Sequence, residues 1–174
     1  GTRLGVFGLR TSGDVGSVTN VEYLYSASIG GDVTGDFDIA DELGTNNVIF
    51  GDFLGELTAG GPVEHLTIRG SFGNSGGSAK FMRVYGEIRN LTIGEVLNGA
   101  VIEARDASNN LTSVQTFIVD DQWGASGDMN GELIAADVEV LVSGGAPLID
   151  IKGDLNGVID LASAFDARML VGGS

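Results

Sequence analysis

Short apolar runs, separated by glycine and polar residues, recur along this chain at nearly regular distances. The clearest unit opens with Gly51-Asp52-Phe53-Leu54-Gly55 and continues through Val63-Glu64-His65-Leu66-Thr67-Ile68-Arg69-Gly70. The opening Gly-Asp-apolar step returns at Gly13-Asp14-Val15, Gly31-Asp32-Val33, Gly127-Asp128-Met129 and Gly153-Asp154-Leu155. The chain is therefore built from a degenerate repeat.

The glycines that close the apolar runs set the length of the repeat. They are evenly spaced at Gly13, Gly31, Gly51 and Gly70, and similar steps separate Gly127 from Gly145 and Gly153 from Gly173. A period of about 20 residues is typical of solenoids, in which each unit buries its apolar face only by stacking on its neighbours.

Within a repeat, the pattern predicts strands of only about three to five residues. In the segment 64–68, alternation places Leu66 and Ile68 on one side of a strand and Thr67 on the other. Glycine, asparagine and aspartate at the joints permit tight corners, which favour parallel sheets over antiparallel hairpins. We predict an all-β fold, namely a right-handed parallel β-helix (β-solenoid) with about 18–20 residues per coil and roughly eight or nine coils. It would form one domain over residues 1–174.

The net charge of the chain limits the kinds of molecule that it can bind. The net charge is −15, from 24 acidic and 9 basic residues, and such a field repels nucleic acid and anionic lipid. Cysteine is absent, which excludes disulfides and thiolate chemistry, and no apolar run approaches the ~18 residues needed to cross a bilayer. We therefore expect neither nucleic-acid binding nor membrane insertion.

Three segments depart from the repeat and are predicted to be loops. They are residues 73–78, 104–110 and 120–124, and the last contains Trp123, the only tryptophan. A lone tryptophan beside acids can stack on a sugar, although such a residue more often covers a gap in a core.

Neither end shows the polar capping element that protects the open edge of a solenoid. The segment is therefore expected to be a slice of a longer repeat protein, or to dock on further copies of itself. The predicted self-assembly interface comprises Leu4, Val6 and Phe7 at one end and Met169, Leu170 and Val171 at the other.

The step Gly-Asp-Leu-x-Gly, followed by Leu-Thr-Ile-x-Gly-Ser-Phe as at 66–72, resembles the Gly-rich β-solenoid repeat proteins of bacterial cell surfaces. Those proteins share a parallel β-helix with filamentous-haemagglutinin-like adhesins. The resemblance covers most of residues 13–173, and it implies an extracellular or cell-surface location with a structural or adhesive role. A weaker resemblance links residues 127–172 to the paired calcium loops of dockerins. The glycine that an EF-hand loop needs at its sixth position is replaced by Leu133.

Three aspartates are the candidate ligands for a metal ion. Asp32, Asp36 and Asp38 lie close together in sequence and could supply oxygen ligands to a structural calcium ion, whereas the simpler interpretation places them at solenoid corners. We therefore predict no metal site, no cofactor and no catalytic residue.

An enzyme of the carbohydrate-active β-helix type would need paired carboxylates on one face, for which Asp120, Asp121 and Glu103 with Arg105 are the candidates. His65, the only histidine, is expected at a surface strand position. Asn90 and Asn110 begin glycosylation sequons, which the repeat itself also explains.

Taken together, the pattern predicts a structural, non-enzymatic extracellular repeat protein. It would form a rod, filament or surface-layer element by end-to-end stacking of strands, with further copies as partners. The alternative is an adhesin or fibre module that binds glycans through the loops at 73–78, 104–110 and 120–124. A carbohydrate-active enzyme is the third interpretation.

Overall fold

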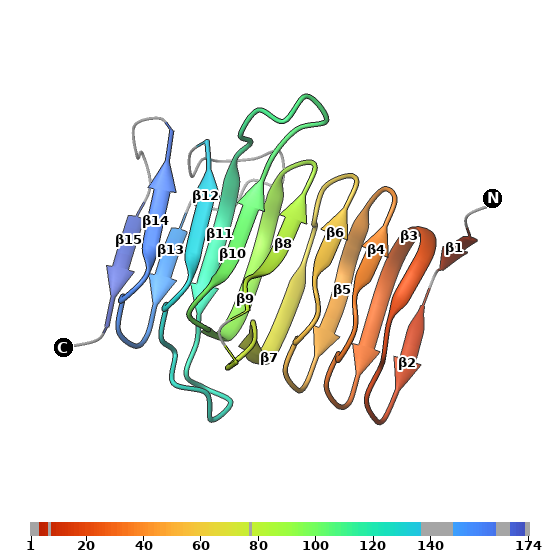
Figure 1. Ribbon diagram of the computed structural model, residues 1–174, viewed down its shortest axis with the longest axis horizontal. Coiled ribbons are helices and arrows are strands. Elements are labelled where there is room, and N and C mark those ends of the chain that lie inside the picture. The colour runs from red at the N-terminus through yellow and green to blue at the C-terminus, as the bar shows by residue number, and fades with distance from the viewer. Residues whose placement is uncertain (1–3, 7, 77, 137–147, 163–167, 173–174) are drawn as a thin grey trace.

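A computed structural model of the chain describes residues 4–6, 8–76, 78–136, 148–162 and 168–172. Its described residues form strands, turns and loops without any helix, and therefore contain no helix that could span a membrane. The strands wind into a solenoid whose successive coils lie side by side along one axis (Figure 1).

Two parallel ladders make up the walls of the solenoid. One contains β4 (Phe37–Ile39), β6 (Leu57–Ala59), β8 (Lys80–Val84), β10 (Ala100–Ala104), β12 (Glu132–Ala135) and β14 (Val158–Leu161). The other contains β3 (Val18–Ile29), β5 (Leu43–Ile49), β7 (Leu66–Phe72), β9 (Ile88–Val96), β11 (Val114–Val119), β13 (Leu148–Ile151) and β15 (Arg168–Val171). β3 joins the two ladders, because it pairs with β4 as well as with β5, and β1 (Leu4–Val6) and β2 (Leu9–Thr11) pair with β3. From β4 onward the chain alternates between the two ladders, as the predicted parallel β-solenoid requires, and this fold class is confirmed.

The core is a set of columns in which equivalent side chains from successive coils lie on one another. One column has eight levels among the described residues, which are Thr11, Ile29, Ile49, Ile68, Ile93, Val119, Ile151 and Val171. A second column contains Phe37, Leu57, Met82, Ile102, Leu133 and Ile159. Edge-to-face contacts join Phe53 to Phe37 and Phe72, with ring centroids 5.3 and 5.9 Å apart. Each coil therefore buries its apolar side only against the next coil.

The predicted repeat length holds at both ends of the molecule but not in its middle. The steps along the column from Thr11 through Ile29 and Ile49 to Ile68 match the predicted length, and so does the step from Ile151 to Val171. Between Ile68 and Ile151 every step is longer than predicted, and the last of these steps is the longest. Insertions leave the solenoid in these middle coils, while the residues of the core column stay paired from coil to coil.

One predicted repeat step is wrong. The coil that begins at Gly127 ends at Gly153, because the Gly153 N–H donates to the Gly127 carbonyl and Met129 pairs with Leu155. Gly145, the predicted end of that coil, falls outside the described residues.

Strand lengths also differ from the short strands that the sequence pattern predicts. β3 has 12 residues and β9 has 9, because these strands continue around a corner of the solenoid instead of stopping there. The register shifts in β3 between Val18 and Val21 and again between Leu24 and Ser26 mark where the strand bends. Leu66 and Ile68 are buried in the core, as predicted, and Thr67 between them is nearly buried as well, at 9% exposed.

Candidate functional site

The aspartate of each Gly-Asp step lies at a corner and joins one coil to the next. Asp14 Oδ1 accepts the Asp32 N–H at 2.9 Å, and Asp32 Oδ1 accepts the Asp52 N–H at 2.8 Å. Asp52 Oδ1 then accepts the Ser71 N–H at 2.7 Å, and Asp128 Oδ1 accepts the Asp154 N–H at 2.8 Å. These carboxylates satisfy backbone donors that no ladder hydrogen bond reaches, so the interpretation of the step as a corner is confirmed.

The calcium alternative at Asp32, Asp36 and Asp38 finds no support in the geometry. Asp36 Oδ1 accepts the Glu56 N–H at 2.9 Å, and Asp38 lies within β4, level with Thr58 of β6. Over the described ranges, no three His, Asp or Glu side chains converge in a way that could hold a metal ion. The segment that resembles a dockerin contributes β12 and β14 to one parallel ladder of the solenoid, and its described residues contain no helix, unlike the helix–loop–helix of an EF-hand.

The predicted loop at 120–124 folds back onto a corner of the solenoid and brings Trp123 over Arg69. The Arg69 guanidinium carbon lies 4.2 Å from the centroid of the Phe50 ring and 5.5 Å from the centroid of the Trp123 ring. Both aromatic side chains remain partly exposed, Phe50 by 44% and Trp123 by 36%. A guanidinium between two rings is favoured electrostatically, and the contact anchors the loop.

A shallow cavity of about 350 Å³ opens beside this stack of Phe50, Arg69 and Trp123. Its acidic and hydroxyl side chains belong to Asp32, Asp52, Ser71, Glu95 and Ser126. The Ser71 hydroxyl donates to Glu95 Oε2 at 3.4 Å. Arg69 makes no ion pair with any described residue, and its buried Nε–H has no hydrogen-bond acceptor in the described structure. We call this feature the arginine pocket.

A second hollow lies at another corner of the solenoid, and most of the side chains that line it are amides. Its cavity of about 470 Å³ is lined by Asn74, Ser75, Leu97, Asn98, Asn130 and Asn156. Asn156 Nδ2 donates to Asn130 Oδ1 at 3.1 Å, so the amides of two coils form a short ladder. Part of the predicted loop at 73–78 forms one side of this asparagine groove.

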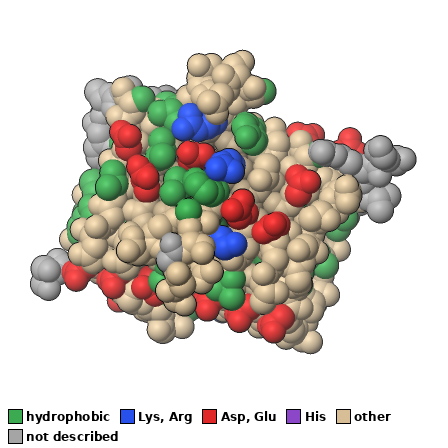
Figure 2. All heavy atoms as spheres, in the orientation of Figure 1, with side chains coloured by type: hydrophobic (Ala, Val, Ile, Leu, Met, Phe, Trp, Pro, Cys, Tyr) green, Lys and Arg blue, Asp and Glu red, His purple; other side chains and the backbone are tan. Residues whose placement is uncertain are grey.

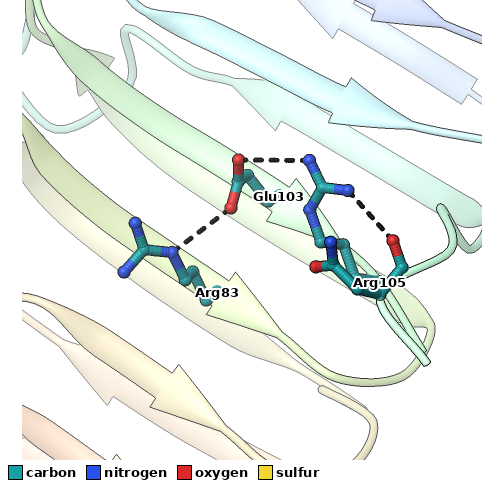
Figure 3. Close-up of polar contacts among 4 residues, drawn as sticks. Arg83, Glu103 and Arg105 are labelled. Carbon is teal, nitrogen blue, oxygen red and sulfur yellow. Dashed lines mark hydrogen bonds and ion pairs between the residues drawn. The ribbon is translucent and has the colours of Figure 1, made fainter. Parts of the chain in front are cut away.

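The predicted loop at 104–110 is a small hairpin beside a chain of charges on the outer face of β8 and β10. Glu103 Oε2 lies 3.3 Å from Arg83 Nε, and Glu103 Oε1 lies 3.4 Å from Arg105 Nη2 (Figure 3). The hairpin closes through Asp106, whose carboxylate accepts hydrogen bonds from the Asn110 side chain and from the backbone N–H groups of Asn110 and Ser108. These bonds, above all the one from the Asn110 side chain, hold the pKa of Asp106 below its ordinary value.

Basic, acidic and apolar side chains are intermixed on the face that Figure 2 shows, and its basic side chains lie close to acidic ones. The Arg83 guanidinium carbon also lies 4.0 Å from the centroid of the Phe81 ring. Arg83 and Arg105 share the Glu103 carboxylate, which neutralises part of their positive charge.

The structure divides the candidate carboxylates of the enzyme interpretation between two ladders. Glu103 lies in β10 and is paired with Arg105, as their closeness in sequence suggested. Asp120 and Asp121 follow β11 in the other ladder, and Asp120 Oδ1 accepts the Gln122 N–H at 3.1 Å. Glu103 and the two aspartates therefore belong to different walls of the solenoid.

His65 is exposed, as predicted, but it lies just before β7 and not within a strand. Its Nε2 is 3.2 Å from Thr67 Oγ1.

The predicted self-assembly residues lie in strands at the two ends of the solenoid. Leu4 and Val6 belong to β1, level with Val21 and Leu24 of β3, and Phe7 falls outside the described residues. At the other end, Met169, Leu170 and Val171 belong to β15, which pairs with β13. In the described structure β15 has no second neighbour in its ladder.

Sequence reasoning missed Phe50 and Arg69. Both follow an isoleucine of the same core column, Ile49 and Ile68, at a position that Gly30 and Gly94 occupy in the coils on either side. An alignment of the repeats on their isoleucines would have shown two large side chains where the neighbouring repeats have glycine.

Comparisons with protein-family models, curated proteins and solved structures return no match to this chain. Functional inference therefore rests on its own geometry.

Proposed function

We propose that this chain is a structural, non-enzymatic extracellular repeat protein that builds a rod, filament or surface-layer element by end-to-end stacking of coils. One observation carries the proposal, namely the change in exposure at the last level of the core columns. Ile93, Val119 and Ile151 are fully buried, whereas Val171, the next residue in their column, is 46% exposed. In the same way Met169, which stacks on the fully buried Ile149 of the preceding coil, is 38% exposed.

The last coil therefore presents core residues that every interior coil covers with its successor. The outer edges of β14 and β15 also carry backbone N–H and C=O groups that no described strand pairs. A further parallel coil, whether from neighbouring repeats of a longer chain or from a second copy, would bury the apolar side chains and pair these groups at once, which is β-strand addition. The first coil of a second copy has the required character, because Val6, Leu9 and Val15 are only partly buried at the opposite end.

Charge supports axial over lateral association. Carboxylates at successive corners, including Asp14, Asp32 and Asp52, form a row along the side of the rod and contribute to the net charge of −15. Two such rods side by side repel each other at low salt, whereas the end face exposes mainly apolar side chains and unpaired backbone.

The test is the mass of the purified chain as a function of concentration, by sedimentation velocity, together with negative-stain microscopy. We expect concentration-dependent oligomers or filaments whose width is that of one solenoid. Met169→Asp and Val171→Asp should abolish them without lowering the melting temperature, because both side chains are already exposed.

Val48→Asp is the matched control, since it adds the same charge on an outward position of β5 in the interior of the rod. Oligomers that persist in both end variants would contradict the proposal, as would a monomer of the unmodified chain at every concentration.

A further inference from the structure

The arginine pocket lies where the regular coils meet the first insertion that folds back on them. Gly94 occupies, in the next coil, the corner position that Arg69 occupies in its own coil. Because Gly94 has no side chain, Ala125 of the inserted loop fits against it. A β-carbon at Gly94 would lie 2.8 Å from the Ala125 Cβ, so a larger residue would push the loop away. The Trp123 ring is thus placed by backbone packing as well as by Arg69.

Two partly exposed aromatic rings at one corner are unusual in this molecule. Phe50 and Trp123 are the only aromatic residues besides Tyr25 among the large apolar side chains exposed in the described structure. Aromatic rings with an exposed surface bind ligands that present apolar C–H groups together with polar groups at their rim.

The polar wall beside the rings supplies the second half of such recognition. Asp32 and Asp52 each use Oδ1 for a backbone N–H of the next coil, which holds the carboxylate in place and leaves Oδ2 without a partner among the described residues. Glu95 receives one weak hydrogen bond, from Ser71. Carboxylates held in this way accept hydrogen bonds from hydroxyl groups, and Arg69 can donate to a ligand oxygen.

The sign of the charge selects among hydroxyl-rich ligands. Three carboxylates line the pocket against one guanidinium, so a carboxylated, sulfated or phosphorylated ligand would be repelled. We infer that the arginine pocket is a carbohydrate-binding site for a neutral sugar unit, with its ring against Trp123 and Phe50 and its hydroxyl groups on Asp32, Asp52 and Glu95. This site is independent of the proposed stacking of coils, because it lies on the side of the rod.

The asparagine groove is the rival location and serves as an internal control. It is larger and offers amide donors and acceptors, but its lining contains Leu97 and no aromatic ring. Binding there would be insensitive to changes at Trp123.

Trp123 is the only tryptophan, so its fluorescence reports on this pocket alone. The unmodified chain is titrated with neutral hexamers of β-1,4-linked, β-1,3-linked and α-1,4-linked glucose, and with a galacturonate hexamer. We expect a saturable fluorescence change with at least one neutral hexamer and none with the galacturonate hexamer. The absence of any change with the neutral hexamers at millimolar concentration would overturn the inference, as would binding of galacturonate alone.

Calorimetric titration of variants with the same hexamer assigns the residues. Trp123→Ala should weaken binding about tenfold and Glu95→Gln several-fold, whereas Trp123→Phe should retain most of the affinity. Asn130→Ala in the asparagine groove should leave the affinity unchanged. Loss of binding in Asn130→Ala with full binding in Glu95→Gln and Trp123→Ala would place the ligand in the rival groove and refute the assignment. Circular dichroism of each variant, which should match that of the unmodified chain, checks the fold.

Discussion

The coils from Thr11 to Ile68 and the coils from Ile68 to Ile151 share one core but treat their corners differently. The earlier coils are short and nearly equal in length, and aspartates join their corners from level to level. The middle coils are longer and unequal in length, and loops project from their corners. The columns of buried isoleucine and valine continue without a break through both regions.

This contrast shows which part of the repeat specifies the fold and which part is free to vary. Stacked apolar columns and backbone ladders maintain the coil, and the corners tolerate insertion because they lie outside the columns. Both hollows described above border residues from inserted segments, Trp123 in one and Asn74 in the other. The regular region provides a surface of constant spacing, and the insertions provide chemical diversity on it.

The largest effect should come from filling a regular corner. In Gly55→Ala the new β-carbon would collide with the backbone carbonyl of Gly35 in the preceding coil, which cannot move without opening the ladder. We expect a loss of about 3 kcal/mol in the free energy of unfolding, measured by urea denaturation. Gly16→Ala is the matched control, because no atom lies within 4 Å of the added carbon. Equal loss in both variants would show that glycine acts only through backbone freedom.

Removal of one corner carboxylate should have the next largest effect. Asp52→Ala leaves the Ser71 N–H without its acceptor. We therefore expect the free energy of unfolding, measured by thermal or urea denaturation, to fall by about 2 kcal/mol. Asp154→Ala is the control, since the Asp154 carboxylate accepts no hydrogen bond from the described residues. A stability change at Asp154 as large as that at Asp52 would argue against the corner hydrogen bond as the cause.

Shortening an insertion should cost little. Replacement of residues 106–110 by a two-residue Asn-Gly turn keeps Arg105 and Leu111, which pair as an antiparallel bridge. Because this hairpin lies outside the core columns, the free energy of unfolding should change by less than about 0.5 kcal/mol. A large loss of stability would mean that the inserted hairpin supports the solenoid and would remove the distinction drawn between the two regions.

The smallest effect should be a change at low pH that is confined to the hairpin closed by Asp106. Hydrogen bonds lower the pKa of Asp106 below its ordinary value of 3.8. They therefore stabilise the hairpin above that pH, and this contribution is lost as the pH falls through the lowered pKa. In an NMR titration, the amide signals of Ser108 and Asn110 should shift together below pH 3.8, while those of the core strands stay in place. Asp106→Asn should abolish this transition.

The fold was predictable because its determinants are local and repeated. A Gly-Asp step before an apolar run marks a corner, and alternation such as Leu66-Thr67-Ile68 marks a buried strand. The arginine pocket was not predictable from the same pattern, because Trp123 reaches Arg69 only through the path of an insertion. The length of an insertion says nothing about the direction in which it folds. The misplaced step from Gly127 to Gly145 has the same origin, since inserted residues shift the count without leaving a sign in the apolar pattern.

The alignment of the ladders has a mechanical consequence. The hydrogen bonds between coils point along the axis of the rod, so a pull on its two ends loads them one coil at a time rather than all together. Such a rod should lengthen in many small steps at low force, each step releasing one coil, and the middle coils should give the longest steps. A pull across the axis, along the strands, would instead shear a whole ladder. The same molecule would therefore be compliant along its length and stiff across it.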